Sequence, residues 1–153
     1  MTPIVPVVNN KGIVIIFSDY SVKLNPYLKI DRHPIPRIEE SLSKNGNCGV
    51  QSKLDMSQAY VQAQLSDKSK EYMTITTHRV LYQPERLFLG VASGPVWFQR
   101  EKEKLLDGIE GISIFFNDVR VIGKNKKEYD DRLRADLTRF REAGITLRIE
   151  KCI

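Results

Sequence analysis

The chain has 153 residues, of which 41% are hydrophobic and 28% charged, enough for one domain with a core and too few for two ordinary domains. Twenty-four Lys and Arg against nineteen Asp and Glu give a formal net charge of +5, which suits a polyanionic partner without identifying one. Cys48 and Cys152 lack zinc-site spacing and are too few for a disulfide framework. With no membrane-length apolar run and no targeting signal, we expect an intracellular, cytoplasmic chain that makes no membrane contact.

The first part of the chain alternates β-rich runs with helix signals. "IVIIF" (13–17) predicts a strand, and a helix is predicted within 32–46 after two prolines. "VQSKLD" (50–55) predicts a strand that delivers Asp55 at its end, and residues 56–65 continue as a turn of helix.

Two more elements precede a hairpin signal. "EYMTITT" (71–77) is rich in β-branched residues and predicts a strand. "GPVWFQREKEKLLDG" (94–108) predicts a helix with Pro95 near its start and Gly108 at its end.

The stretch "GISIFFNDVRVIG" (111–123) predicts a β-hairpin, because apolar residues alternate and glycines bound both ends. Its turn is expected at the dipeptide Asn117–Asp118, since Asn and Asp side chains bond the local backbone. On this stretch alone a plain turn is the stronger interpretation. The alternative is a metal site that has lost one of two carboxylates.

The last predicted elements complete the fold class. Residues 126–144 predict a helix. Its apolar stripe is expected to contain Tyr129, Leu133, Leu137 and Phe140, with four arginines elsewhere on the surface, Arg132, Arg134, Arg139 and Arg141. "ITLRIE" (145–150) predicts a closing strand. The order of elements predicts an α+β fold, a mostly antiparallel sheet with helices packed on one face.

Five segments together resemble one family. They are "DYSVKLNPYLKIDRHPIPRIEE" (19–40), "SKLDMSQAY" (52–60), "GVASGPVWFQR" (90–100), "FFNDV" (115–119) and "EAGITLRIEKC" (142–152). In order and spacing they resemble the reverse transcriptase of gypsy-type LTR retrotransposons. The resemblance implies a right-hand polymerase with fingers at about 1–30 and 63–93 and palm at about 31–62 and 94–153. The family's thumb and ribonuclease H would be absent from this chain.

The resemblance also implies a metal site. Family members use one Asp at the end of a palm strand and two adjacent Asp in the neighbouring hairpin to hold two Mg²⁺ ions. Asp55 matches the first and Asp118 the last, so both are expected catalytic and metal-binding residues. Asn117 stands at the position of the central catalytic Asp, so the hairpin looks like a metal turn that has lost one carboxylate.

Further roles follow from the resemblance alone. Lys151 matches a basic residue thought to protonate pyrophosphate, although an ordinary surface lysine is the plainer interpretation. Tyr60 matches the residue that packs under the incoming sugar, although it is equally a core aromatic. Met56, Leu89, Gly90 and, by a loose match, Lys11 fall at other nucleotide-binding positions. Ile15 stands where an Arg usually grips the triphosphate.

Three functional hypotheses follow. The first is a truncated, catalytically impaired reverse transcriptase domain whose family partners are primer–template nucleic acid and dNTP. The second is an active RNA-directed DNA polymerase completed by parts from elsewhere. The third is a domesticated module that binds nucleic acid or a protein without chemistry.

Overall fold

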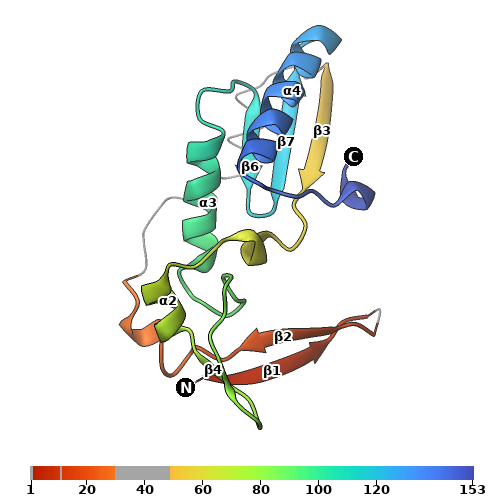
Figure 1. Cartoon of the computed structure of the whole chain (residues 1–153). Coiled ribbons are helices and arrows are strands. Elements are labelled where there is room, and N and C mark those ends of the chain that lie inside the picture. Colours follow the sequence, from red (N-terminus) through yellow and green to blue (C-terminus); the bar gives the residue numbers. More distant parts are fainter. Residues whose placement is uncertain (1, 11, 30–48) are drawn as a thin grey trace. The chain divides into compact units, whose positions relative to one another are not determined.

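The structure is a computed structural model that describes residues 2–10, 12–29 and 49–153 (Figure 1). The helix predicted within 32–46 lies outside the described residues. The described chain forms two compact units, the first made of residues 2–29 and 60–95 and the second of residues 49–59 and 96–153. One core was expected. Two units form because the chain builds two separate sheets, each with its own buried residues.

The first unit contains a four-stranded sheet in the order β2-β1-β4-β5. Its strands are β1 (Thr2–Val8), β2 (Val14–Ser18), β4 (Ile75–Thr76) and β5 (Leu81–Tyr82). β1 and β4 are parallel and the other neighbours antiparallel. Tyr20 is fully buried and its hydroxyl donates to the Met73 carbonyl at 3.0 Å. A 3₁₀ turn, η1 (Asn25–Tyr27), follows β2.

The prediction of a strand over 71–77 is wrong at its start. Residues Asp67–Tyr72 form the helix α2, which begins after Ser66, whose hydroxyl accepts the Ser69 N–H. Asp67 in the first turn favours the helix further, because an acidic side chain complements the helix dipole. Only Ile75–Thr76 pair as a strand.

The second unit contains an antiparallel sheet in the order β3-β7-β6. The strand β3 (Val50–Asp55) has the predicted bounds, and the predicted hairpin is formed by β6 (Ile112–Phe115) and β7 (Asp118–Gly123). Leu54, Val119 and Val121 are buried and alternate with residues that stay partly exposed. After β3, the predicted helical turn is a 3₁₀ turn, η2 (Ala59–Gln62), at which the chain passes into the first unit.

Two helices accompany this sheet (Figure 1). As predicted, residues Gly94–Leu105 form α3, which lies beside β6, and Lys126–Glu142 form α4, which packs on β7 and β3. No helix among the described residues is long and apolar enough to cross a membrane.

The buried stripe of α4 differs from the prediction. Leu137 is exposed, whereas Asp136 and Phe140 are buried. Arg132, expected on the surface, is largely covered and donates to the Ile122 carbonyl at 2.6 Å. Hydrophobic periodicity misplaced Arg132, because its position is set by a network of ion pairs with the carboxylates of Glu110 and Glu128.

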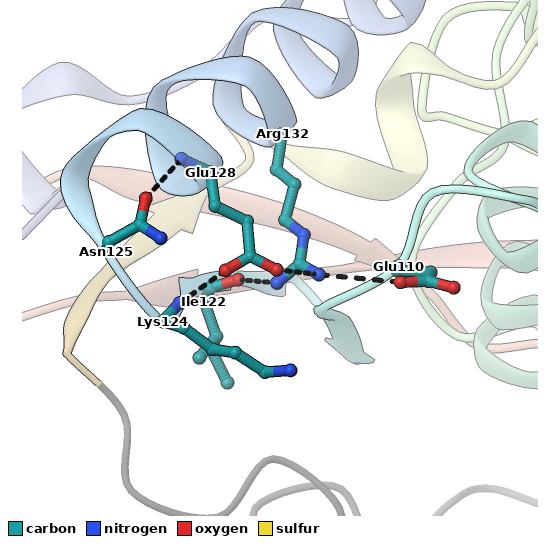
Figure 2. A network of polar contacts seen from close by, with 6 residues as sticks. All are labelled: Glu110, Ile122, Lys124, Asn125, Glu128 and Arg132. Atoms are coloured by element: carbon teal, nitrogen blue, oxygen red, sulfur yellow. Dashed lines mark hydrogen bonds and ion pairs between the residues drawn. The ribbon is translucent and has the colours of Figure 1, made fainter.

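That network fastens the end of β7 to the first turns of α4 (Figure 2). The Arg132 guanidinium contacts Glu128 at 2.6 Å and Glu110 at 3.6 Å. The other Glu128 oxygen accepts the Lys124 N–H at 2.9 Å, and the Asn125 side chain caps the helix by accepting the Glu128 N–H at 2.9 Å.

The strand predicted at 145–150 is wrong. Leu147 forms an isolated bridge with Met56, and Ile149–Lys151 turn into the 3₁₀ helix η3. The turn interrupts the ladder, which resumes where the Lys53 N–H donates to the Ile153 carbonyl at 2.7 Å. The outer edge of β3 is therefore closed by this C-terminal segment.

Candidate active site

Asp55 and Asp118 lie directly opposite each other on β3 and β7. The Met56 N–H donates to the Asn117 carbonyl at 3.1 Å, so the Asp55–Asp118 pair falls at a non-hydrogen-bonded position of the ladder, where opposite residues approach most closely. Facing Cβ atoms in such pairs are about 4.5–5.5 Å apart. Both carboxylates therefore project from the same face of the sheet, next to each other.

The hairpin turn lies one residue earlier than predicted. Phe115 pairs with Asp118, so Phe116 and Asn117 form the turn and Asp118 begins β7. Phe116 has a φ of +47°, a left-handed conformation that is costly for a bulky residue and needs support from its surroundings.

Gln99 of α3 supplies that support. Its side chain is fully buried. Its Oε1 accepts the Phe116 N–H at 3.1 Å, and its Nε2 donates to the Ile114 carbonyl at 3.0 Å and to Glu103 at 2.7 Å. The sequence did not single out Gln99. One feature of the sequence could have indicated its role: Gln99 is a polar residue next to Phe98 in a helix that was expected to pack against the sheet.

Lys53 contacts the site from within β3. Residues two apart on a strand share a face, so Lys53 and Asp55 lie on one side with their register partners Arg120 and Asp118. We call these four residues the carboxylate face. Lys53 Nζ is 2.8 Å from Asp118 Oδ2. Among the described residues none forms an ion pair with Asp55.

A second lysine lies in the interior near the hairpin. Lys102 of α3 is 2% exposed, its Nζ is 4.9 Å from the centre of the Phe98 ring, and no hydrogen-bond partner for it exists in the described part of the chain. Burial lowers the pKa of Lys102 to about 8, while the charges of Glu103 and Asp118 work against that shift. Lys102 is therefore mostly cationic at pH 7.

The donor set does not fit two Mg²⁺ ions, although reverse transcriptases as a family use divalent metals. Mg²⁺ needs near-octahedral oxygen coordination supported by carboxylates. Here Asp118 is engaged by Lys53, and Asn117 offers only a neutral amide whose Oδ1 is buried. In the described ranges, no three His, Cys, Asp or Glu side chains gather closely enough to hold a metal.

The other predicted site residues fall in both units. In the second unit, Met56 is 3% exposed and therefore a core residue, and Lys151 is exposed in η3. In the first unit, Tyr60 is half-buried, and this burial raises the pKa of its hydroxyl. Ile15 pairs with Val7 in the β1–β2 hairpin. Lys11 lies outside the described residues.

Leu89 and Gly90 belong to a loop fixed within the first unit. The Leu89 carbonyl accepts the Ser18 N–H at 3.3 Å, and the Gly90 carbonyl accepts the Asn25 amide at 3.0 Å. Gly90 has a φ of +110°, and a Cβ there would collide with the Ser18 carbonyl. Glycine is needed at this position for the backbone alone.

A three-stranded antiparallel sheet with one Asp ending a strand, another following the adjacent hairpin turn and helices packed against it is the palm of a right-hand polymerase, here with part of the fingers. The chain belongs to the reverse transcriptase (RNA-dependent DNA polymerase) family, whose model matches residues 15–153.

Individual relatives agree with this assignment. The chain is 30% identical to "Uncharacterized protein K02A2.6" of Caenorhabditis elegans over 129 residues, 84% of this chain and 10% of that protein. It is 30% identical to the "Retrovirus-related Pol polyprotein from transposon 412" of Drosophila melanogaster over 132 residues, 85% of this chain and 11% of that protein. The chain thus spans about a tenth of these relatives' length.

Solved structures share the fold. A foamy viral protease-reverse transcriptase in complex with RNA/DNA hybrid matches 99% of this chain and 20% of its own, with a TM-score of 0.87 and 21% identity. A foamy viral complex with double-stranded DNA matches 99% of this chain and 26% of its own, with a TM-score of 0.84 and 23% identity.

Proposed function

We propose that the chain is the fingers and palm of a gypsy-type LTR retrotransposon reverse transcriptase that binds primer–template nucleic acid but is impaired in metal-dependent nucleotide addition. The fingers would comprise about 1–30 and 63–93, and the palm about 31–62 and 94–153. The observation that carries the proposal is Asp55 facing Asp118 with Asn117 in the adjoining turn. Asp55 and Asp118 would be the remaining catalytic residues.

The missing carboxylate has a large expected effect. Phosphoryl transfer depends on holding the primer hydroxyl and the dNTP phosphate in line and on balancing the charge that develops there. If the loss of one carboxylate costs about 4 kcal/mol in the transition state, the rate falls by roughly three orders of magnitude. The roles predicted in handling dNTP and pyrophosphate remain predictions for six residues, Lys11, Met56, Tyr60, Leu89, Gly90 and Lys151.

Nucleic-acid binding is supported by the fold and the charge. Foamy viral enzymes of the same fold were solved in complex with RNA/DNA hybrid and with double-stranded DNA, and this chain carries a net charge of +5. Contacts to phosphates release counterions, so such binding weakens steeply with salt and is nearly independent of sequence.

Fluorescence anisotropy with a labelled RNA/DNA hybrid tests the binding. We expect at least a tenfold loss of affinity between about 50 and 200 mM salt if several phosphates are contacted. Two hybrids of unrelated sequence serve as matched controls and should bind alike. Affinity that does not respond to salt would contradict a nucleic-acid groove.

A non-catalytic binding module is the second candidate. The Lys53–Asp118 ion pair favours it, because the carboxylates are partly neutralised by the chain itself. Primer extension on an RNA template, with an intact family enzyme as positive control, decides the catalytic question. We expect no extension by this chain, and efficient extension would overturn both the impaired enzyme and the non-catalytic module.

A further inference from the structure

The carboxylate face carries its own cations. Lys53 and Asp118 are diagonal neighbours across β3 and β7, within reach of a long side chain. The ammonium of Lys53 is 2.8 Å from Asp118 Oδ2, and both side chains are about one-third exposed, 36% and 33%. Arg120, directly opposite Lys53, adds a second positive charge to the same face.

The interior adds a third positive charge. Lys102 is buried in α3, and the charge of Asp118 opposes the lowering of its pKa by burial. Of the two carboxylates of the site, that of Asp118 is thus contacted by Lys53 and also interacts with the charge of the buried Lys102. The usual third carboxylate, which would favour a divalent cation, is replaced by the neutral Asn117.

We propose that the Lys53 ammonium is the resident cation of the Asp55–Asp118 pair and excludes divalent metal from it. The inference rests on the proposed function, because it takes Asp55 and Asp118 as the active-site carboxylates. A divalent ion that used Asp118 Oδ2 would have to displace Lys53, and it would be repelled by the tethered ammonium at close range. Dissolved salt screens this repulsion only in part at such distances, because they are shorter than the Debye length.

The test is a titration with Mn²⁺ alone, in which electron paramagnetic resonance measures the free ion. Lys53→Gln removes the ammonium and keeps a polar side chain, whereas Lys53→Arg keeps the charge. Lys126→Gln is the matched control, because Lys126 also forms an ion pair in the second unit, with Asp130 at 3.1 Å. It lies beyond the far end of β7, and that end, Gly123, is about 17 Å from Asp118 by the rise of a strand.

We expect Lys53→Gln to bind Mn²⁺ at least about tenfold more tightly than the unmodified chain. Lys53→Arg and Lys126→Gln should bind as weakly as the unmodified chain. Equal affinities for Lys53→Gln and Lys126→Gln would overturn the proposal, as would tight binding by the unmodified chain or by Lys53→Arg. Lys53→Met gives the same comparison if Lys53→Gln does not fold.

The outcome separates this inference from the proposed function. If Lys53→Gln tightens Mn²⁺ binding while the chain fails to bind RNA/DNA hybrid, the proposed function fails and the resident cation stands. If hybrid binding is salt-dependent but Lys53→Gln binds Mn²⁺ no more tightly than the unmodified chain, only the proposal of a resident cation is refuted.

Discussion

The carboxylate face and the interior of the second unit differ in how their charged side chains are accommodated. On the carboxylate face, Lys53 and Asp118 are partly exposed and form an ion pair. In the interior, Lys102 and Asp136 are almost fully buried, and in the described part of the chain neither has a hydrogen-bond partner. Exposed pairs contribute about 0–1 kcal/mol to stability, whereas an uncompensated buried charge costs several.

The comparison separates interior polar residues that are hydrogen-bonded from interior residues whose charged groups have no hydrogen bond in the described part of the chain. Gln99 is an interior polar residue whose amide oxygen and nitrogen are both hydrogen-bonded, and it holds the strained turn at Phe116. Lys102 and Asp136 have no such contacts. Substitutions should therefore destabilise the protein at Gln99, stabilise it at Asp136 and Lys102, and change ion binding more than stability on the carboxylate face.

The largest effect is expected at Gln99. Gln99→Leu leaves the Phe116 N–H and the Ile114 carbonyl without their partner, and each buried unsatisfied group costs roughly 1–3 kcal/mol. We expect the free energy of unfolding in urea to fall by about 2–4 kcal/mol. Gln51→Leu is the control, because Gln51 is exposed in the same unit. An equal loss for both variants would refute the role assigned to Gln99.

The next effect is a pH dependence caused by Asp136. Burial raises the pKa of Asp136 to about 7, and the charge of Arg139 only partly opposes this. Between pH 4 and 7 the folded state therefore holds a proton that the unfolded state has released, so this group's contribution to stability falls as the pH rises.

Asp136→Asn removes that dependence. At pH 8 we expect its free energy of unfolding to exceed that of the unmodified chain by roughly 1–3 kcal/mol. This difference should shrink as the pH falls towards 4. Asp131→Asn, on the exposed side of α4, should give a gap near zero at every pH. A gap for Asp136→Asn that does not change with pH would contradict the buried-charge explanation.

A smaller gain is expected at Lys102. Lys102→Met keeps an unbranched side chain of similar length and removes the buried ammonium, so stability in urea at pH 7 should rise by about 1–2 kcal/mol. Lys104→Met serves as control, because Lys104 is exposed and paired with Glu101 at 2.9 Å. A loss of stability at Lys102 would show that its ammonium has a partner in solution.

The smallest stability change is expected for Asn117→Asp. A third carboxylate near Asp55 and Asp118 increases repulsion in the metal-free chain and should lower stability by up to about 1 kcal/mol at low salt. The same charge should tighten Mn²⁺ binding in calorimetry. Primer extension should remain absent, since Lys53 still contacts Asp118. Robust extension by this single variant would show that Asn117 was the only defect.

Local patterns predicted the second unit better than the first. The strand at 50–55 and the hairpin were predicted because apolar alternation is a local signal, and β3–β7 register then placed Asp55 opposite Asp118. The strand β1 was not predicted, because it contains Pro3 and Pro6 and proline is uncommon inside strands. The Asn9 N–H donates to the Ile13 carbonyl, and hydrogen-bonded pairs alternate along an antiparallel ladder. The Pro6–Ile16 pair is therefore not hydrogen-bonded, so β1 tolerates a proline at residue 6.

Contacts between distant residues explain the remaining errors. Gln99 and Lys53 act through partners that a linear pattern does not reveal, and the burial of Lys102 is not apparent from its residue type. The stripe of α4 was misassigned because a charged residue, Asp136, takes a buried position. The roles predicted for Asp55, Asp118 and Lys151 in catalysis, and for Tyr60 in nucleotide binding, stay predictions.

The closure of β3 by residues 147–153 also determines when the site can form. The Asp55 carbonyl accepts the Arg148 N–H at 2.8 Å, and the Lys53 backbone exchanges two hydrogen bonds with Ile153. Asp55 is thus held by β7 on one side and, on the other, by residues synthesised more than ninety positions later. Such non-local pairing forms slowly, because a long loop must close first. During synthesis on the ribosome, the backbone groups of Lys53 and Asp55 that pair with residues 148–153 therefore lack these partners until that segment has emerged.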